Sequence, residues 1–242
     1  MRYRLRQDDK AAAAHDNAAT SVDKVNPMPK PMRIDFVSDV VCPWCVIGLK
    51  SLAAALAKAA DVVTPEIHFQ PFELNPDMPR EGQNVAEHIA QKYGADPERS
   101  RGTREMIRTS AEGFGFAMRT GPESRIWNTF DCHRLLHWAA TDGHQPALKM
   151  ALFTAHFTDG KDLGDPQVLV DAAQAAGLDP EKAREILESG AYIDDVRRDE
   201  RFWREQGITA VPSIIIDGKY LITGGQPVEA FERAIRNIAA EA

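Results

Sequence analysis

Two cysteines three positions apart, Cys42 and Cys45, are the side chains in this sequence best suited to chemistry. Pro43 follows the first of them and is typical of the first turn of a helix, where its missing N–H would have no partner. Residues three apart share one helix face, so the two thiols are expected within bonding distance. Unpaired N–H groups at a helix start favour a thiolate, the attacking species in disulfide exchange. The spacing predicts a redox pair with Cys42 as the nucleophile and Cys45, one turn deeper, as the resolving thiol.

Two other interpretations of the pair are zinc ligation and a pair of buried thiols without a reactive role. A zinc site needs two further ligands, and the sequence has no second C-x-x-C and no H-x3-H, although the fold could bring Cys132 and His133 close. The apolar segment before the pair and the proline inside it favour redox chemistry. We therefore predict a redox site and no metal, with Pro43 and Trp44 setting how well the thiolate is stabilised.

A proline just before an apolar strand gives a second indication. Pro212 lies between Val211 and the apolar run that begins at Ser213. Because proline cannot donate to a sheet ladder, it must lie at the start or edge of a strand. A cis Val211–Pro212 bond would turn the Val211 backbone outward, where it could pair with an extended substrate beside the disulfide. A trans proline at the start of the strand is the ordinary alternative.

The elements expected around these residues come from the two ends of the chain. A strand over 34–37, the helix after Cys42 and a strand over 67–72 make a β-α-β unit. Apolar runs over 213–216 and 220–222, joined by Asp217-Gly218, predict a hairpin, and an amphipathic helix from Val228 completes a β-β-α unit.

Between these units, residues 84–207 show helical spacing. Helix starts are expected at three Asp-Pro pairs, Asp96-Pro97, Asp165-Pro166 and Asp179-Pro180, where aspartate would cap and proline would begin a helix. Another helix is expected over 126–140. The prediction is one α/β domain over 32–242 with an all-helical insertion at about 80–206, after a tail over 1–31 that is too poor in large apolar residues to fold.

Composition excludes several functions. The 242 residues carry a net charge of −7, whereas a nucleic-acid-binding protein would show a basic face. No apolar run approaches the roughly 18 residues that a membrane span needs, and three cysteines are too few for a secreted disulfide framework. Because no apolar segment follows the basic start, the tail does not look like a signal peptide, and we predict a cytoplasmic protein.

Five segments together resemble the DsbA-type thioredoxin-fold oxidoreductases, specifically the FrnE-like branch. They are Ser38–Cys45 with Ile47-Gly48, Pro71–Pro76, Asn128-Thr129 with His133–Leu135, Gly207–Pro212, and Gly224–Pro227. The resemblance implies a thioredoxin fold with a helical insertion, Cys42 as nucleophile, Cys45 as resolving thiol and Pro212 as a cis-proline. It also implies dithiol–disulfide oxidoreductase or isomerase activity on thiol- or disulfide-containing proteins or small thiols. No bound cofactor is implied, glutathione could serve as a co-substrate, and a homodimer is left open.

Substrate contacts are expected at Pro43, Trp44 and Val211 beside the thiols, with His133 as a further candidate. His133 could relay protons, although a lone helical histidine is more often packed or solvent-facing. Cys132 could be a third redox partner if the insertion folds over the site, and otherwise is a small buried residue.

Two other functions compete with disulfide exchange. One is glutathione-dependent isomerisation of a small aromatic or polyketide-like molecule, although proteins of that kind typically carry serine in place of the nucleophilic cysteine. The other is a non-catalytic chaperone or binding module that uses the same cleft.

Overall fold

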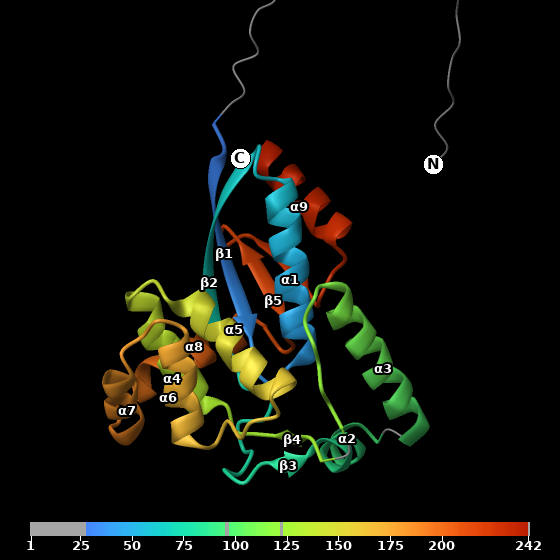
Figure 1. Ribbon diagram of the computed structural model, residues 1–242. Helices are drawn as coiled ribbons and strands as arrows, with labels where there is room; N and C mark the ends of the chain where they lie inside the picture. The colour runs from blue at the N-terminus through green and yellow to red at the C-terminus, as the bar shows by residue number, and fades with distance from the viewer. Residues whose placement is uncertain (1–27, 95–96, 122, 242) are drawn as a thin grey trace, which may run out of the picture.

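The two ends of the chain form a four-stranded sheet, in a computed structural model that describes residues 28–94, 97–121 and 123–241. The strand order is β2-β1-β5-β6, with β1 parallel to β2 and antiparallel to β5, and β5 antiparallel to β6 (Figure 1). The bounds are β1 (Lys30–Ser38), β2 (Val63–Pro71), β5 (Ser213–Ile216) and β6 (Tyr220–Thr223).

The central strands are buried because apolar side chains fill them. Ile34 and Phe36 on β1, and Ile214 and Ile216 on β5, are fully buried. Helix α1 (Pro43–Lys58) packs against α9 (Val228–Glu241) beside the sheet, and both contribute to this first core (Figure 1). The β-α-β and β-β-α units of a thioredoxin-like fold are thus confirmed.

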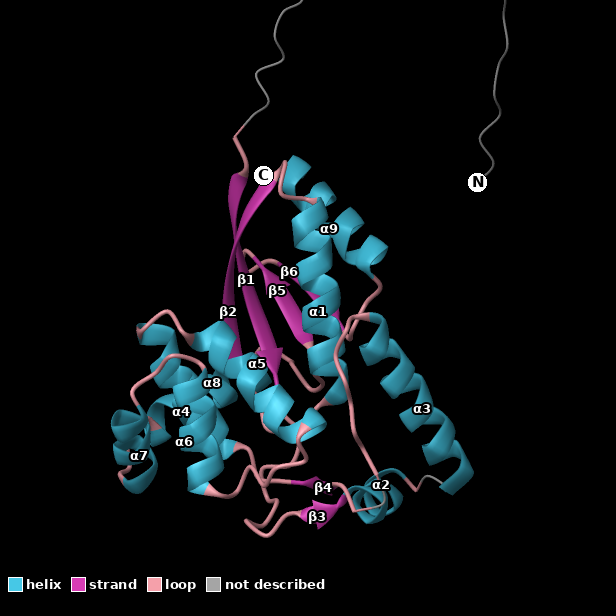
Figure 2. Ribbon diagram, in the orientation of Figure 1, coloured by secondary structure: helices cyan, strands magenta, loops and turns pink. Residues whose placement is uncertain are grey.

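The insertion between β2 and β5 is helical, with one short antiparallel pair, β3–β4, set apart from the main sheet (Figure 2). Its elements are β3 (Gln83–Asn84), α2 (Val85–Tyr93), α3 (Pro97–Gly113), β4 (Arg125–Ile126), α4 (Phe130–Thr141), α5 (Gln145–Phe153), the π-helical turn η1 (Thr154–Thr158), α6 (Pro166–Ala175), α7 (Pro180–Glu188) and α8 (Ile193–Glu205).

Local signals predicted several element ends correctly. Asp165 and Asp179 cap α6 and α7, each accepting a hydrogen bond from the backbone N–H two residues later at 2.9 Å. The hairpin turn is formed by Asp217 and Gly218, with φ of 51° and 66°. Asp96 lies outside the described residues.

Other boundaries differ from the predictions. Strand β1 begins at Lys30, before the expected start, because it pairs along its whole length with β2; residues 1–27 of the predicted tail lie outside the described residues. Ile126 belongs to β4 and not to a helix. Helix α4 begins only at Phe130, whose N–H donates to Asn128 Oδ1 at 3.0 Å.

The segment before Cys42 joins two cores. Val40 and Val41 pack in a second core formed by the insertion, whereas Cys42 and Cys45 belong to the first core. This segment therefore lies where the sheet unit and the insertion meet.

Candidate functional site

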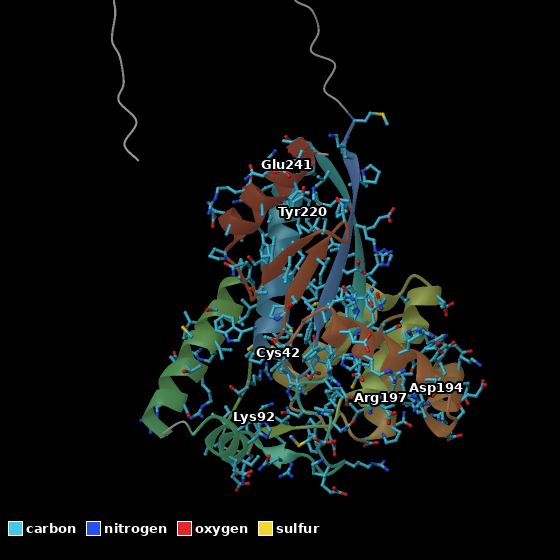
Figure 3. The ribbon with its side chains drawn as sticks, turned by 180° about the vertical axis from the view of Figure 1, so that it is seen from behind. Cys42, Lys92, Asp194, Arg197, Tyr220 and Glu241 are labelled. Carbon is cyan, nitrogen blue, oxygen red and sulfur yellow. The ribbon has the colours of Figure 1, made fainter. Side chains whose placement is uncertain are left out.

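Cys42 is the residue that caps the start of α1. Its backbone is extended, with φ of −91° and ψ of 113°, and Pro43 occupies the first turn, as predicted. The Cys45 N–H donates to the Cys42 carbonyl at 3.0 Å, and both side chains are free thiols. Cys42 is 4% exposed and Cys45 is fully buried, so Cys42 is the residue of the pair nearer the surface. Figure 3 shows Cys42 at the end of α1, near the insertion.

The loop before β5 lies against this thiol. The Val211–Pro212 peptide bond is cis, as the resemblance implied. The Cys42 thiol donates to the carbonyl oxygen of Val211 at an Sγ–O distance of 3.7 Å. The structure thus brings together Cys42, Val211 and Pro212, which are far apart in the sequence.

Glycine allows this loop to approach α1. A Cβ atom on Gly48 would lie 3.1 Å from Pro212 Cγ and 3.2 Å from Gly225 Cα. Ser51 Oγ donates to the Gln226 carbonyl at 2.7 Å and fixes the loop before α9 on the same helix. The glycines at 48 and 225 are therefore needed for close packing around the thiols.

The two thiols have different surroundings. Burial raises the pKa of Cys45 well above its ordinary value, and the hydrogen bond and charge of Cys42 raise it further. The charge of Lys149 and the backbone of Asp39 act in the opposite direction. Cys45 is thus suited to remain protonated until a neighbouring cation or base assists its ionisation.

Lys149 is the main residue that sequence analysis missed. It lies on α5, is fully buried, and its Nζ has no hydrogen-bond partner among the described residues. Nζ lies 5.2 Å from the ring centroid of Phe153 and 6.0 Å from that of Phe69. Burial lowers the pKa of Lys149, while the charges of Cys45 and its neighbours raise it. The available signal was a lysine on the apolar side of a helix, where leucines surround it.

A buried carboxylate and a buried histidine face each other beside Lys149. Asp39 Oδ1 lies 3.7 Å from His133 Nε2, and Asp39 Oδ2 accepts from the Leu74 N–H at 2.8 Å. Burial raises the pKa of Asp39, but His133 and the Leu74 N–H offset this and leave the pKa lowered. Lys149 and His133 both line a cavity of about 330 Å³. His133 is 2% exposed, so its polar contact is with Asp39 inside the protein.

Cys132 is packed in the second core. It is fully buried, and burial, followed by the charge of Asp39, raises the pKa of its thiol. Both effects favour the neutral thiol, which suits the interpretation as a small buried residue.

A cluster of Glu73, Glu200 and Arg197 joins the end of β2 to α8. Arg197 Nη1 contacts Glu73 Oε2 and also lies 2.8 Å from Glu200 Oε2, and its Cζ lies 3.7 Å from the ring centroid of Phe130. Burial, followed by the charge of Glu200, raises the pKa of Glu73 to about 7. The cluster explains the Pro71–Pro76 motif as a contact that holds the insertion against the sheet.

Within the described ranges, no group of three His, Cys, Asp or Glu side chains could hold a metal ion. Of the helices described, none combines the length and apolar character needed to cross a bilayer.

Comparisons with known proteins agree with this geometry. The sequence model of the family described as "DSBA-like thioredoxin domain" matches residues 33–236. Uncharacterized protein YwbO of Bacillus subtilis is 29% identical over 205 residues, which are 84% of this chain and 96% of YwbO. The crystal structure of probable DsbA oxidoreductase SCO1869 from Streptomyces coelicolor has a TM-score of 0.82 and 35% identity, over 87% of this chain and 91% of that one. A 2-hydroxychromene-2-carboxylate isomerase shares the fold, with a TM-score of 0.65 and 13% identity over 86% of this chain and 97% of the isomerase.

Proposed function

Because the chain belongs to the family of DSBA-like thioredoxin domains, we propose that it is a thiol–disulfide oxidoreductase acting through Cys42 and Cys45. Its substrates are thiol- or disulfide-containing proteins or small thiols. One observation carries the proposal: a thiol at the start of α1 lies 3.7 Å from the Val211 carbonyl, with a second, buried thiol one turn deeper. The similarity to SCO1869, described as a probable DsbA oxidoreductase, supports the same activity.

In the reducing direction, the Cys42 thiolate attacks a substrate disulfide. One substrate thiolate leaves and takes a proton, while the other stays bound to Cys42 as a mixed disulfide. Cys45 then loses its proton and attacks the Cys42 sulfur, which releases the second substrate thiolate and forms the Cys42–Cys45 disulfide. The oxidising direction is the reverse, beginning with a substrate thiolate that attacks Cys42 and displaces Cys45.

The different burial of the two thiols supports this assignment of roles. Cys42 keeps a small exposed fraction, 4%, whereas Cys45 has none, so an external sulfur would meet Cys42 before Cys45. Pro43, Trp44 and Val211 are all partly exposed beside it and would contact the substrate. His133, 2% exposed and facing Asp39, would act through that carboxylate rather than by touching a substrate.

Four finer points belong to the same proposal. Membership of the FrnE-like branch rests on the sequence motifs, and a cytoplasmic location rests on the composition of the chain. Glutathione is proposed as a co-substrate that returns the pair to its starting redox state. One chain suffices for the reaction because both thiols lie at the start of α1.

Cysteine variants test the proposal. Cys45→Ser should accumulate mixed disulfides through Cys42, because the resolving thiol is gone. Cys42→Ser should lose thiol exchange, while Cys132→Ser, which removes a buried thiol outside the pair, should retain it. Wild-type activity of Cys42→Ser in insulin reduction would contradict the mechanism.

The two competing functions give different results. An isomerase of a small aromatic molecule would bind glutathione saturably without redox titration of the cysteine pair. The isomerase of known structure shares the fold at 13% identity, and a shared fold alone does not carry an activity. A binding or chaperone module would keep its function after replacement of both cysteines by serine.

A further inference from the structure

A cavity of about 280 Å³ lies against the segment that carries Cys42, although Cys42 itself does not line it. Val41 and Pro43, the two neighbours of Cys42 in the sequence, both line it. Its volume is close to the lower end, about 300 Å³, of sites that hold small molecules. A molecule in this cavity would therefore contact the two residues that flank the proposed nucleophile.

The walls of the cavity are mainly apolar and come from the insertion. Helices α2 and α3, strand β4 and the turn η1 supply them, with side chains that include Val85, Ile89, Ile107, Ile126, Trp127 and Phe157. Apolar and aromatic walls favour a ligand with an apolar, flat body. Glutathione, a charged and polar tripeptide, would leave most of this surface without a matching partner.

The charged groups of the lining are mostly cationic. Arg104, Arg125 and Lys161 line the cavity, against one acidic side chain, Glu123. Within the described part of the chain, Arg104 and Lys161 take part in no ion pair. Arg125 donates to the backbone carbonyls of residues 81 and 82 at 2.8 and 3.0 Å, so its charge is not neutralised by a carboxylate.

Two histidines that also line the cavity, His88 and His156, are uncharged near neutral pH. Burial lowers the pKa of His156 to about 4 and also lowers the pKa of His88. The net charge around the cavity is therefore positive, which favours an anion.

We propose that this cavity binds the small-molecule substrate of the redox pair, an apolar and negatively charged disulfide or thiol of the aromatic carboxylate class. The inference rests on the proposed function and names a substrate for it. The Cys42 thiolate attacks the bound disulfide and one aromatic thiolate leaves. Cys45 then attacks the Cys42 sulfur, forms the Cys42–Cys45 disulfide and releases the second aromatic thiolate. The protein dithiol and the substrate disulfide thus become a protein disulfide and two substrate thiols.

Two aromatic disulfides of different charge test the kinetics. The reduced protein is mixed with 5,5′-dithiobis(2-nitrobenzoate), which is anionic, or with 4,4′-dithiodipyridine, which is neutral near pH 7. The double variant Arg104→Met/Lys161→Met should slow the reaction with the anionic reagent about fivefold and leave the neutral one nearly unchanged. Arg101→Met is the matched control, because Arg101 is exposed on α3 and does not line the cavity.

Direct binding separates this inference from the proposed function. In Cys42→Ser, calorimetry should detect naphthalene-2-carboxylate more strongly than the neutral naphthalene-2-carboxamide, and the double cation substitution should remove the difference. If the protein reacts with both disulfides and the double variant leaves the ratio of the two reaction rates unchanged, the inference is wrong. The proposed function would then still stand. Carboxylate binding without any reactivity of Cys42 would support the site and overturn the redox function. No preference for the carboxylate in Cys42→Ser would also overturn the inference.

Discussion

The side chains of Lys149 and Cys45 are both fully buried, and each group shifts the pKa of the other. In the part of the chain that the structure describes, Nζ of Lys149 has no hydrogen-bond partner and lies over two phenylalanine rings. A charge without a partner is costly in the interior, so its position is best understood through the thiol that must ionise during exchange.

Lys149→Met should therefore make Cys45 harder to ionise. The apparent pKa seen in release of a mixed disulfide from Cys42 should rise by about one unit, and release at pH 7 should slow about tenfold. The pH profile of single-turnover release measures this. Stability should not fall, because methionine removes a buried charge and fills similar space. Lys219→Met, at an exposed turn, is the control. An unchanged pH profile of release in Lys149→Met would contradict the role of Lys149 in the ionisation of Cys45.

The Glu73 cluster predicts a pH dependence of stability. The pKa of Glu73 is about 7 in the folded protein against an ordinary value of 4.5, so folding favours its protonated form. This contribution is fully present below pH 4.5 and is lost as pH rises through 7. Glu73→Gln should weaken that loss, by an amount on the order of 2 kcal/mol. Urea unfolding between pH 4 and 8 measures it, with exposed Glu229→Gln as the control. Parallel curves for wild type and Glu73→Gln would contradict the assignment.

Gly48→Ala should disturb the site through packing. The new Cβ would lie 3.1 Å from Pro212 Cγ and 3.2 Å from Gly225 Cα, so the loops must move. We expect a loss of about 1–3 kcal/mol in unfolding free energy and slower thiol exchange. Gly102→Ala on α3, where the new Cβ would meet no described atom within 4 Å beyond its own stretch of helix, should instead gain about 0.5–1 kcal/mol. Thermal unfolding of both variants is the measurement, and equal effects would show that helix propensity alone decides the outcome.

Arg134→Met should destabilise the insertion. Arg134 donates to the carbonyls of Ser189 and Ala191 at 2.6 and 2.9 Å, and also to that of Ile186. Loss of these bonds should cost about 2–4 kcal/mol, because the buried carbonyl of Ile186 and two partly buried carbonyls are left without this partner. Hydrogen exchange should accelerate around the end of α7, whereas Arg201→Met, at an exposed position of α8, should leave it unchanged. Unaltered exchange in Arg134→Met would refute this role.

Local patterns predicted most of the fold. The turn at Asp217-Gly218 lies between two apolar runs, and both residues adopt the positive φ that such a turn requires. The start of β1 could not be predicted in the same way. Lys30 and Pro31 are not typical strand residues, and they become strand because they pair with Val63 and Thr64 on β2.

Some residues of the candidate site could be predicted from local sequence patterns, and others could not. Cys42 and Cys45 could be identified from their spacing, because helix geometry alone brings them together. Lys149 and Glu73 could not, since their surroundings depend on how the insertion lies against the sheet. A sequence pattern records which residues are apolar but not which distant element covers them.

The chain leaves the sheet unit once, after Pro71, and returns to it once, at Ser213. The thiols belong to the sheet unit, whereas Lys149 and most of the cavity wall belong to the excursion between these points. The two sulfur atoms and most of the surface that selects what reaches them are therefore encoded on separate stretches, although Lys149 links the excursion to the ionisation of Cys45. A chimera carrying the excursion of a relative on this scaffold is expected to inherit the relative's preference while keeping its own reactive pair.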